Sequence, residues 1–108
     1  MLHGMPFIQE DGARDRFLVN RAVFTSPEVL QQEFEEIFDH TWVYVGHGSE
    51  IQNPGDFRTR WVAGRPIIFC RDHGGEARAL LNVCPHRGAL VCREWEGNAR
   101  NFSCMYHG

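Results

Sequence analysis

The chain has 108 residues, four of them cysteines, and a formal net charge of −3 at pH 7. This length allows at most one small domain with a modest core, and the mildly acidic balance offers no basic surface for nucleic acid. No run approaches the ~20 apolar residues of a membrane span, and the first residues lack the basic and apolar regions of a signal peptide.

The first third of the chain predicts an arm followed by one helix. Residues 1–25 are weakly patterned, so we expect an extended or partly mobile arm. Ser26 and Pro27 mark a helix start, as N-cap and first helical residue. Apolar side chains then recur at helical spacing: Leu30, Phe34, Ile37 and Phe38. We predict an amphipathic helix over about 27–39, within a segment 26–41 that packs on the domain after it.

Beyond residue 41 the pattern changes to short strands separated by turns. Runs rich in β-branched and aromatic residues are the candidate strands: 42–45, 57–62, 66–71 and 77–83. Gly64-Arg65 suits a tight hairpin between the second and third of them, with Gly64 supplying a positive φ. The sequence therefore predicts a mostly β fold, with a small antiparallel β domain over 42–108 preceded by one amphipathic helix.

Two short motifs each combine one sulfur and one imidazole donor. The first motif is Cys84-Pro-His86, and the second is Cys104-Met-Tyr-His107. Thiolate and imidazole together suit zinc or iron–sulfur chemistry. The mixture is also the donor set of a [2Fe–2S] centre in which two histidines replace two cysteines on one iron. We therefore interpret the two motifs as ligand boxes for one metal centre.

The residues between the boxes predict how the boxes meet. Segments 89–94 and 99–103 flank a turn signal at 95–98, so we expect a hairpin that places the two boxes side by side at its open end. Gly88 and Gly108 follow the two histidines closely. Glycine there permits a positive φ and lets backbone N–H groups approach a cofactor.

The boxes with their glycines, Cys84-Pro-His-Arg-Gly88 and Cys104-Met-Tyr-His-Gly108, resemble the cluster-binding boxes of Rieske proteins. The resemblance is greatest to the large (alpha) subunit of Rieske non-haem iron ring-hydroxylating oxygenases and covers roughly residues 26–108. Ala89 and Tyr106 stand where Rieske proteins of cytochrome complexes carry further cysteines. The oxygenase or ferredoxin type therefore fits better.

The resemblance implies the cluster ligands, an electron donor and an electron acceptor. Cys84 and Cys104 would bind one iron of a [2Fe–2S] cluster, and His86 and His107 the other. A ferredoxin or flavoprotein reductase would supply electrons. A mononuclear non-haem Fe(II) would receive them and activate O2 to hydroxylate an aromatic ring. The large subunits are expected to form homo-trimers or hetero-oligomers with a small beta subunit.

The resemblance also leads us to expect that the chain is an N-terminal fragment. In the family, the mononuclear iron lies in a large C-terminal domain, and further strands follow the second box. The sequence ends at Gly108. We therefore expect an incomplete Rieske domain over 42–108, without the catalytic domain and inactive as an oxygenase on its own.

Two other functions remain open at this stage. A free-standing Rieske ferredoxin would carry electrons without catalysis. A structural zinc module would use the same donors, although such modules usually group them as Cys-x2–4-Cys and His-x3–5-His.

The cysteines and histidines outside the boxes are assigned structural positions. Cys70 and Cys92 are expected to be buried as small apolar residues, and free cysteines favour a reduced, cytoplasmic setting. His47 is expected to be a turn residue. The remaining histidines are expected to be solvated or to follow the helix: His3, His40 and His73.

Overall fold

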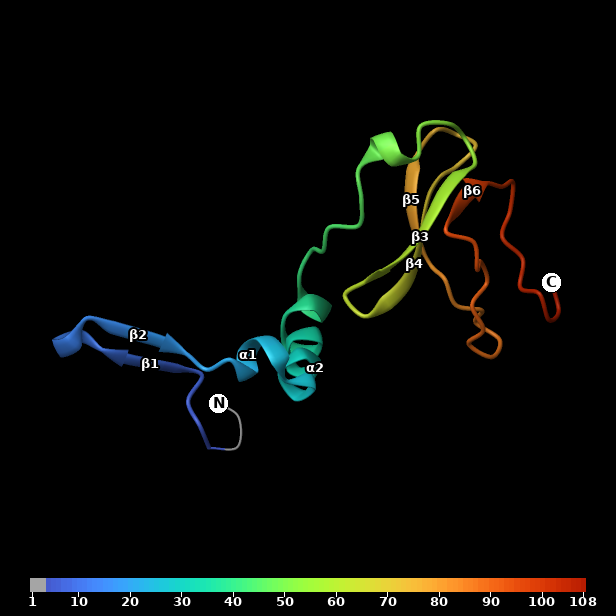
Figure 1. Ribbon diagram of the computed structural model, residues 1–108. Coiled ribbons are helices and arrows are strands. Elements are labelled where there is room, and N and C mark those ends of the chain that lie inside the picture. Colours follow the sequence, from blue (N-terminus) through green and yellow to red (C-terminus); the bar gives the residue numbers. More distant parts are fainter. Residues whose placement is uncertain (1–3) are drawn as a thin grey trace. The chain divides into compact units, whose positions relative to one another are not determined.

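The computed structural model describes residues 4–108 (Figure 1). The chain divides into two compact units, of which the first ends at Trp42 and the second begins at Val43. Among the described residues, no helix is long and apolar enough to cross a membrane.

The first unit begins with a hairpin where the sequence predicted an unpatterned arm. Strands β1 (Ile8–Asp11) and β2 (Arg16–Val19) pair antiparallel around the 3-10 turn η1 (Gly12–Arg14). The prediction is wrong for this stretch because nearly every residue of both strands is exposed. Without a buried face, the strands need no alternation of apolar and polar residues. His3 lies outside the described residues.

Two helices follow the hairpin, α1 (Ala22–Thr25) and α2 (Pro27–Glu36). The Ser26 side chain accepts a hydrogen bond from the backbone N–H of Val29 at 3.4 Å, so the predicted N-cap is confirmed. Helix α2 ends at Glu36, earlier than predicted, and a 3-10 turn η2 (Phe38–His40) continues the chain. The predicted packing of this segment on the following domain stays a prediction.

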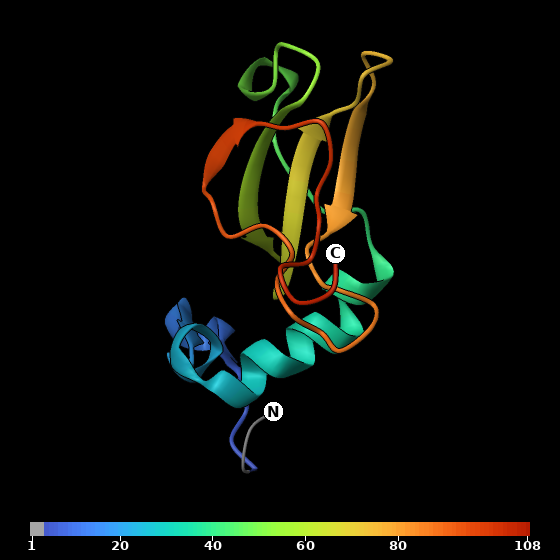
Figure 2. The same ribbon diagram turned by 90° about the vertical axis from the view of Figure 1, so that its right-hand side faces the viewer.

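The second unit is built on a four-stranded antiparallel sheet in the order β5-β4-β3-β6 (Figure 2). After the 3-10 turn η3 (Gly48–Glu50), its strands are β3 (Asp56–Val62), β4 (Arg65–Arg71), β5 (Ala77–Leu81) and β6 (Glu96–Asn98). The predicted strands at 57–62, 66–71 and 77–83 are confirmed to within two residues, whereas 42–45 forms no strand. The predicted hairpin at Gly64 is also confirmed: Ala63 and Gly64 form its two-residue turn with φ of 49° and 79°.

The predicted hairpin between the two boxes is wrong. Residues 96–98 are not a turn but the edge strand β6, which pairs with β3 so that Gly97 lies opposite Phe57. A β-carbon at Gly97 would lie 3.0 Å from the Phe57 ring. Glycine is therefore required by the close approach of this ring, and it does not mark a turn.

The core of the second unit lies under β3 and β4. Its buried members are Phe57, Ile68, Cys70 and Cys92. Phe102 packs edge-on against the Phe57 ring, with 5.2 Å between centroids. The prediction that Cys70 and Cys92 are buried small residues is confirmed, at 6% and 8% exposure. Because Phe102 belongs to this packing, the core also anchors the segment that leads into Cys104.

Candidate metal centre

The two ligand boxes have the same local fold. In the first, the Gly88 N–H donates to the Cys84 carbonyl at 2.9 Å, and in the second the Gly108 N–H donates to the Cys104 carbonyl at 2.9 Å. Both glycines have positive φ, 79° and 85°, as the sequence predicted. Each box is therefore a tight turn that begins at its cysteine and closes at its glycine.

The two turns lie beside one another and line a single cavity of about 310 Å³. In Figure 2, the loop that follows β5 (orange) and the end of the chain (red) lie close together near one end of the sheet. Residues of both boxes line the cavity: Cys84, His86, Arg87, Gly88, Ala89, Cys104, Tyr106 and His107. All four predicted ligands are among them.

Within the cavity the donors come as two like pairs. The imidazole rings of His86 and His107 are 5.1 Å apart between centroids, with their planes at 81°. The Cys84 thiol lies within hydrogen-bonding reach of the Cys104 sulfur. The histidines are exposed and the cysteines are half-buried. Each pair therefore combines the same kind of donor from the two turns: one pair is two cysteines and the other is two histidines.

The second box favours a thiolate at Cys104. The backbone N–H of Tyr106 donates to its sulfur, and this is the main reason why the pKa of the Cys104 thiol lies below its usual value. The Cys84 thiol, the backbone N–H of His107 and the charge of Arg93 act in the same direction. The thiolate is the form of cysteine that binds a metal.

The donor set fits a two-iron cluster. Among residues 4–108, no three His, Cys, Asp or Glu side chains lie together as ligands for one metal ion. A [2Fe–2S] cluster with mixed ligands needs two protein donors at each iron. The two thiols and two imidazoles of this cavity supply such pairs.

A buried side chain that sequence reasoning missed fastens the first box to the sheet. Asn82 follows β5 and is 3% exposed. Its side-chain amide donates to the Cys92 carbonyl at 2.7 Å, and its side-chain oxygen accepts from the N–H groups of Val91 and Cys92 at 3.1 and 2.8 Å. These bonds join the start of the loop that contains the first box, at Asn82, to its end at residues 91–92. The only signal in the sequence is a polar residue inside an apolar run.

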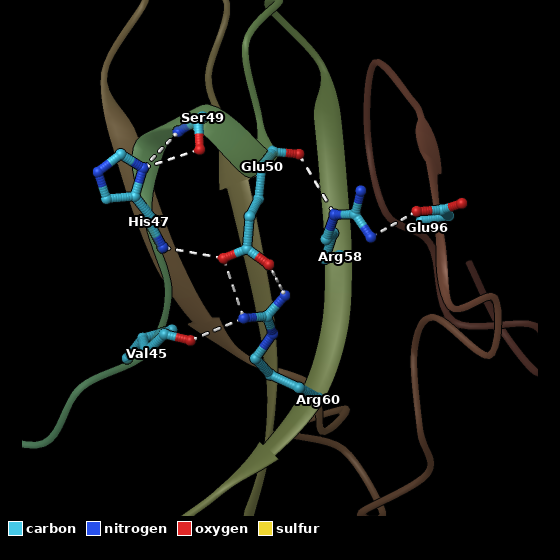
Figure 3. A network of polar contacts seen from close by, with 7 residues as sticks. All are labelled: Val45, His47, Ser49, Glu50, Arg58, Arg60 and Glu96. Carbon is cyan, nitrogen blue, oxygen red and sulfur yellow. Dashed lines mark hydrogen bonds and ion pairs between the residues drawn. The ribbon is translucent and has the colours of Figure 1, made fainter.

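A polar network anchors the segment before β3 onto the face of the sheet opposite Phe57 (Figure 3). The Arg60 guanidinium binds both carboxylate oxygens of Glu50, at 2.9 and 3.2 Å, and donates to the Val45 carbonyl at 3.0 Å. Arg58 donates to the Glu50 carbonyl and forms an ion pair with Glu96 at 2.6 Å. The bonds from Arg60 and from a backbone N–H lower the pKa of Glu50 to about 2. Glu50 is therefore ionised at neutral pH.

His47 is a capping residue of this segment. Its backbone N–H donates to Glu50 at 2.8 Å, and its Nδ1 accepts from the Ser49 N–H at 3.2 Å. The prediction of a turn histidine is confirmed. The other two described histidines outside the boxes are exposed: His40 lies in the 3-10 turn after α2, and His73 lies near the Arg100 carbonyl.

Comparison with known proteins decides what kind of domain carries this cavity. The Rieske [2Fe–2S] domain family matches residues 41–108, more than half of the chain. The chain belongs to this family. Its Rieske domain corresponds to the N-terminal region of aromatic dioxygenase large subunits.

Relatives of this Rieske domain are parts of much longer oxygenase chains. The large subunit of anthranilate 1,2-dioxygenase from Acinetobacter baylyi is 42% identical over 84% of the chain and 19% of its own length. The structure of naphthalene 1,2-dioxygenase from Rhodococcus sp. superimposes with a TM-score of 0.75 and 48% identity, over 83% of this chain and 20% of that one. The structure of a quaternary ammonium Rieske monooxygenase superimposes with a TM-score of 0.70 and 41% identity, over 81% of this chain and 25% of that one. The chain thus spans about a fifth of the length of its relatives.

Proposed function

We propose that this Rieske domain is the electron-accepting part of an aromatic ring-hydroxylating oxygenase large subunit. In this proposal it receives electrons from a ferredoxin or flavoprotein reductase and passes them to a mononuclear non-haem Fe(II) elsewhere in the full subunit, where O2 is activated. The observation that carries the proposal is the single cavity lined by two thiols and two imidazoles from two matching turns. The names of the relatives, which are oxygenase subunits, favour the oxygenase over a free-standing ferredoxin.

The proposed ligands are Cys84 and Cys104 for one iron, and His86 and His107 for the other. A bound [2Fe–2S] cluster supplies reversible one-electron chemistry at a potential above that of all-cysteine clusters, because two neutral imidazoles replace two anionic thiolates. The chain's own contribution is to hold the ligands. The Tyr106 and His107 N–H groups donate to the Cys104 sulfur and so stabilise its thiolate.

The protein environment supports further parts of the proposal. All four cysteines are free, and Cys70 and Cys92 are buried, which suits a reduced, cytoplasmic setting. His86 and His107 are exposed, and in this proposal the electron partner approaches the domain at these two side chains. An aromatic substrate and assembly with a small beta subunit belong to the same proposal and are supported by the relatives' names, which give an aromatic compound and an alpha or large subunit. Assembly as a homo-trimer is a further part of the proposal.

Metal and sulfide analysis tests the proposal. After anaerobic reconstitution with ferrous iron and sulfide, we expect two irons and two acid-labile sulfides per chain. His86→Ala should lose the cluster, whereas His73→Ala, which changes an exposed histidine outside the cavity, should retain it. Binding of zinc without sulfide would show that the site is a structural zinc module.

A further inference from the structure

We propose that, when the cluster is absent and the glutathione pool becomes oxidised, Cys84 and Cys104 form a reversible disulfide that closes the site to iron. The oxidant is a low-molecular-weight disulfide such as oxidised glutathione. The inference rests on the proposed function, because it takes these two cysteines as cluster ligands, but the bond itself can be tested without any metal.

The two cysteine side chains lie on the wall of the same cavity. The Cys84 thiol is within hydrogen-bonding reach of the Cys104 sulfur, and both residues line the same cavity. Each cysteine backbone is fixed in its turn, because its carbonyl accepts a hydrogen bond of 2.9 Å from the N–H of Gly88 or Gly108. A disulfide requires side chains that face one another over a short separation. Two cysteines on the wall of one cavity, within hydrogen-bonding reach of one another, are such a pair.

Solvent access distinguishes this pair from the other two cysteines. Cys84 and Cys104 are half-buried at the wall of an open cavity, so a small disulfide can reach them. Cys70 and Cys92 are only 6% and 8% exposed and belong to the core under β3 and β4. Buried thiols such as these react slowly because the oxidant cannot approach the sulfur.

The chemistry is two successive thiol–disulfide exchanges. One cysteine thiolate attacks a sulfur of oxidised glutathione, the glutathione S–S bond breaks, and one glutathione thiolate leaves. The other cysteine thiolate then attacks the sulfur of the first cysteine, the protein S–S bond forms, and the second glutathione thiolate leaves. The two cysteines lose two electrons and release two protons, and oxidised glutathione is reduced to two glutathione molecules.

The bond has two consequences for the site. A cysteine sulfur held in a disulfide is no longer a thiolate, so neither residue can bind iron until the bond is reduced. The disulfide also keeps both sulfurs at a reversible oxidation level, because sulfinic and sulfonic acids form from free thiolates. In the domain without a cluster, the disulfide would therefore protect both cysteines from irreversible oxidation.

Peptide mapping of the metal-free chain tests the bond directly. We expect a Cys84–Cys104 cross-link after incubation with mixed oxidised and reduced glutathione, exceeding the glutathione adduct by about tenfold because the second exchange is intramolecular. Cys84→Ser should convert the product to glutathionylated Cys104. The Cys70→Ala/Cys92→Ala variant should keep the cross-link. Adducts without a cross-link in the native chain, or a cross-link that uses Cys70 or Cys92, would overturn the proposal.

Cluster transfer from a pre-assembled [2Fe–2S] donor protein tests the second half of the proposal. The disulfide form should take up no cluster until it is reduced, and the reduced form should load, as followed by iron and sulfide content. Loading of the oxidised form without reduction would overturn the inference. A cross-linking chain whose reduced form still fails to load would support the disulfide and contradict the proposed function, so the two failures can be distinguished.

Discussion

The side chain of Asn82 should determine the stability of the second unit. Asn82→Ala removes three hydrogen bonds and leaves the N–H groups of Val91 and Cys92 and the Cys92 carbonyl without their partner. Leaving a buried polar group unsatisfied costs about 1–3 kcal/mol, and water can reach the half-buried Val91 more easily than Cys92. We therefore expect a loss of about 3–5 kcal/mol in the free energy of unfolding.

This loss is large relative to the total. At about 0.05–0.15 kcal/mol per residue, a unit of this size has a stability of only roughly 3–10 kcal/mol. Urea unfolding of the metal-free chain, followed by tryptophan fluorescence, gives the change in unfolding free energy. We also expect the Asn82→Ala chain to bind less iron and sulfide on reconstitution, because the loop that contains the first box is no longer fixed at residues 91–92.

Asn98→Ala is the matched control. Asn98 also makes side-chain hydrogen bonds, to the Pro54 carbonyl and to Asp56, both at 2.9 Å, but it is exposed. Water replaces both bonds when its side chain is removed, so the urea midpoint should change much less than in Asn82→Ala. If the two variants lost the same stability, burial would not be the source of the effect and the reasoning would be refuted.

Three further changes test other parts of the fold and site. Gly97→Ala places a β-carbon 3.0 Å from the buried Phe57 ring and should destabilise the second unit by about 1–3 kcal/mol in urea; an unchanged midpoint would show that the ring moves freely. Because the hydrogen bond from Arg60 lowers the pKa of Glu50 to about 2, the stabilisation that Glu50 gives should be complete above about pH 4.5 and lost as the pH falls toward 2. The difference in urea midpoint between wild type and Glu50→Gln should therefore shrink over that range, and a pH-independent difference would contradict the assignment. His107→Cys should lower the reduction potential of the loaded domain by on the order of 100 mV or more in a redox titration, because a thiolate adds negative charge to the cluster; an unchanged potential would argue against His107 as a ligand.

The elements that sequence predicted well are those fixed by neighbouring residues. Strand β3 alternates in side-chain character, β4 is a short apolar run, and the turn between them needs the positive φ that Gly64 provides. The N-cap at Ser26 acts within three residues. The ligand boxes are equally local, because each turn closes between a cysteine and a glycine four residues later.

Two of the predictions that failed depend on contacts between distant residues. Residues 42–45 have strand composition, but the Val45 carbonyl accepts from the Arg60 side chain and not from a neighbouring strand. Residues 96–98 read as a turn, yet the Thr59 N–H donates to the Trp95 carbonyl and draws this segment onto β3. Nothing in the spacing of these residues indicates their partner. The Asn82 contacts are missed for the same reason.

The two matching turns both contribute ligands to the same proposed cluster. Each turn presents one sulfur and one imidazole, and under the proposed assignment those two donors belong to different irons. Neither turn alone can then complete the coordination of either iron, so occupancy should be all-or-none. With too little iron, the population should divide into fully loaded and empty chains rather than accumulate molecules that hold a single iron.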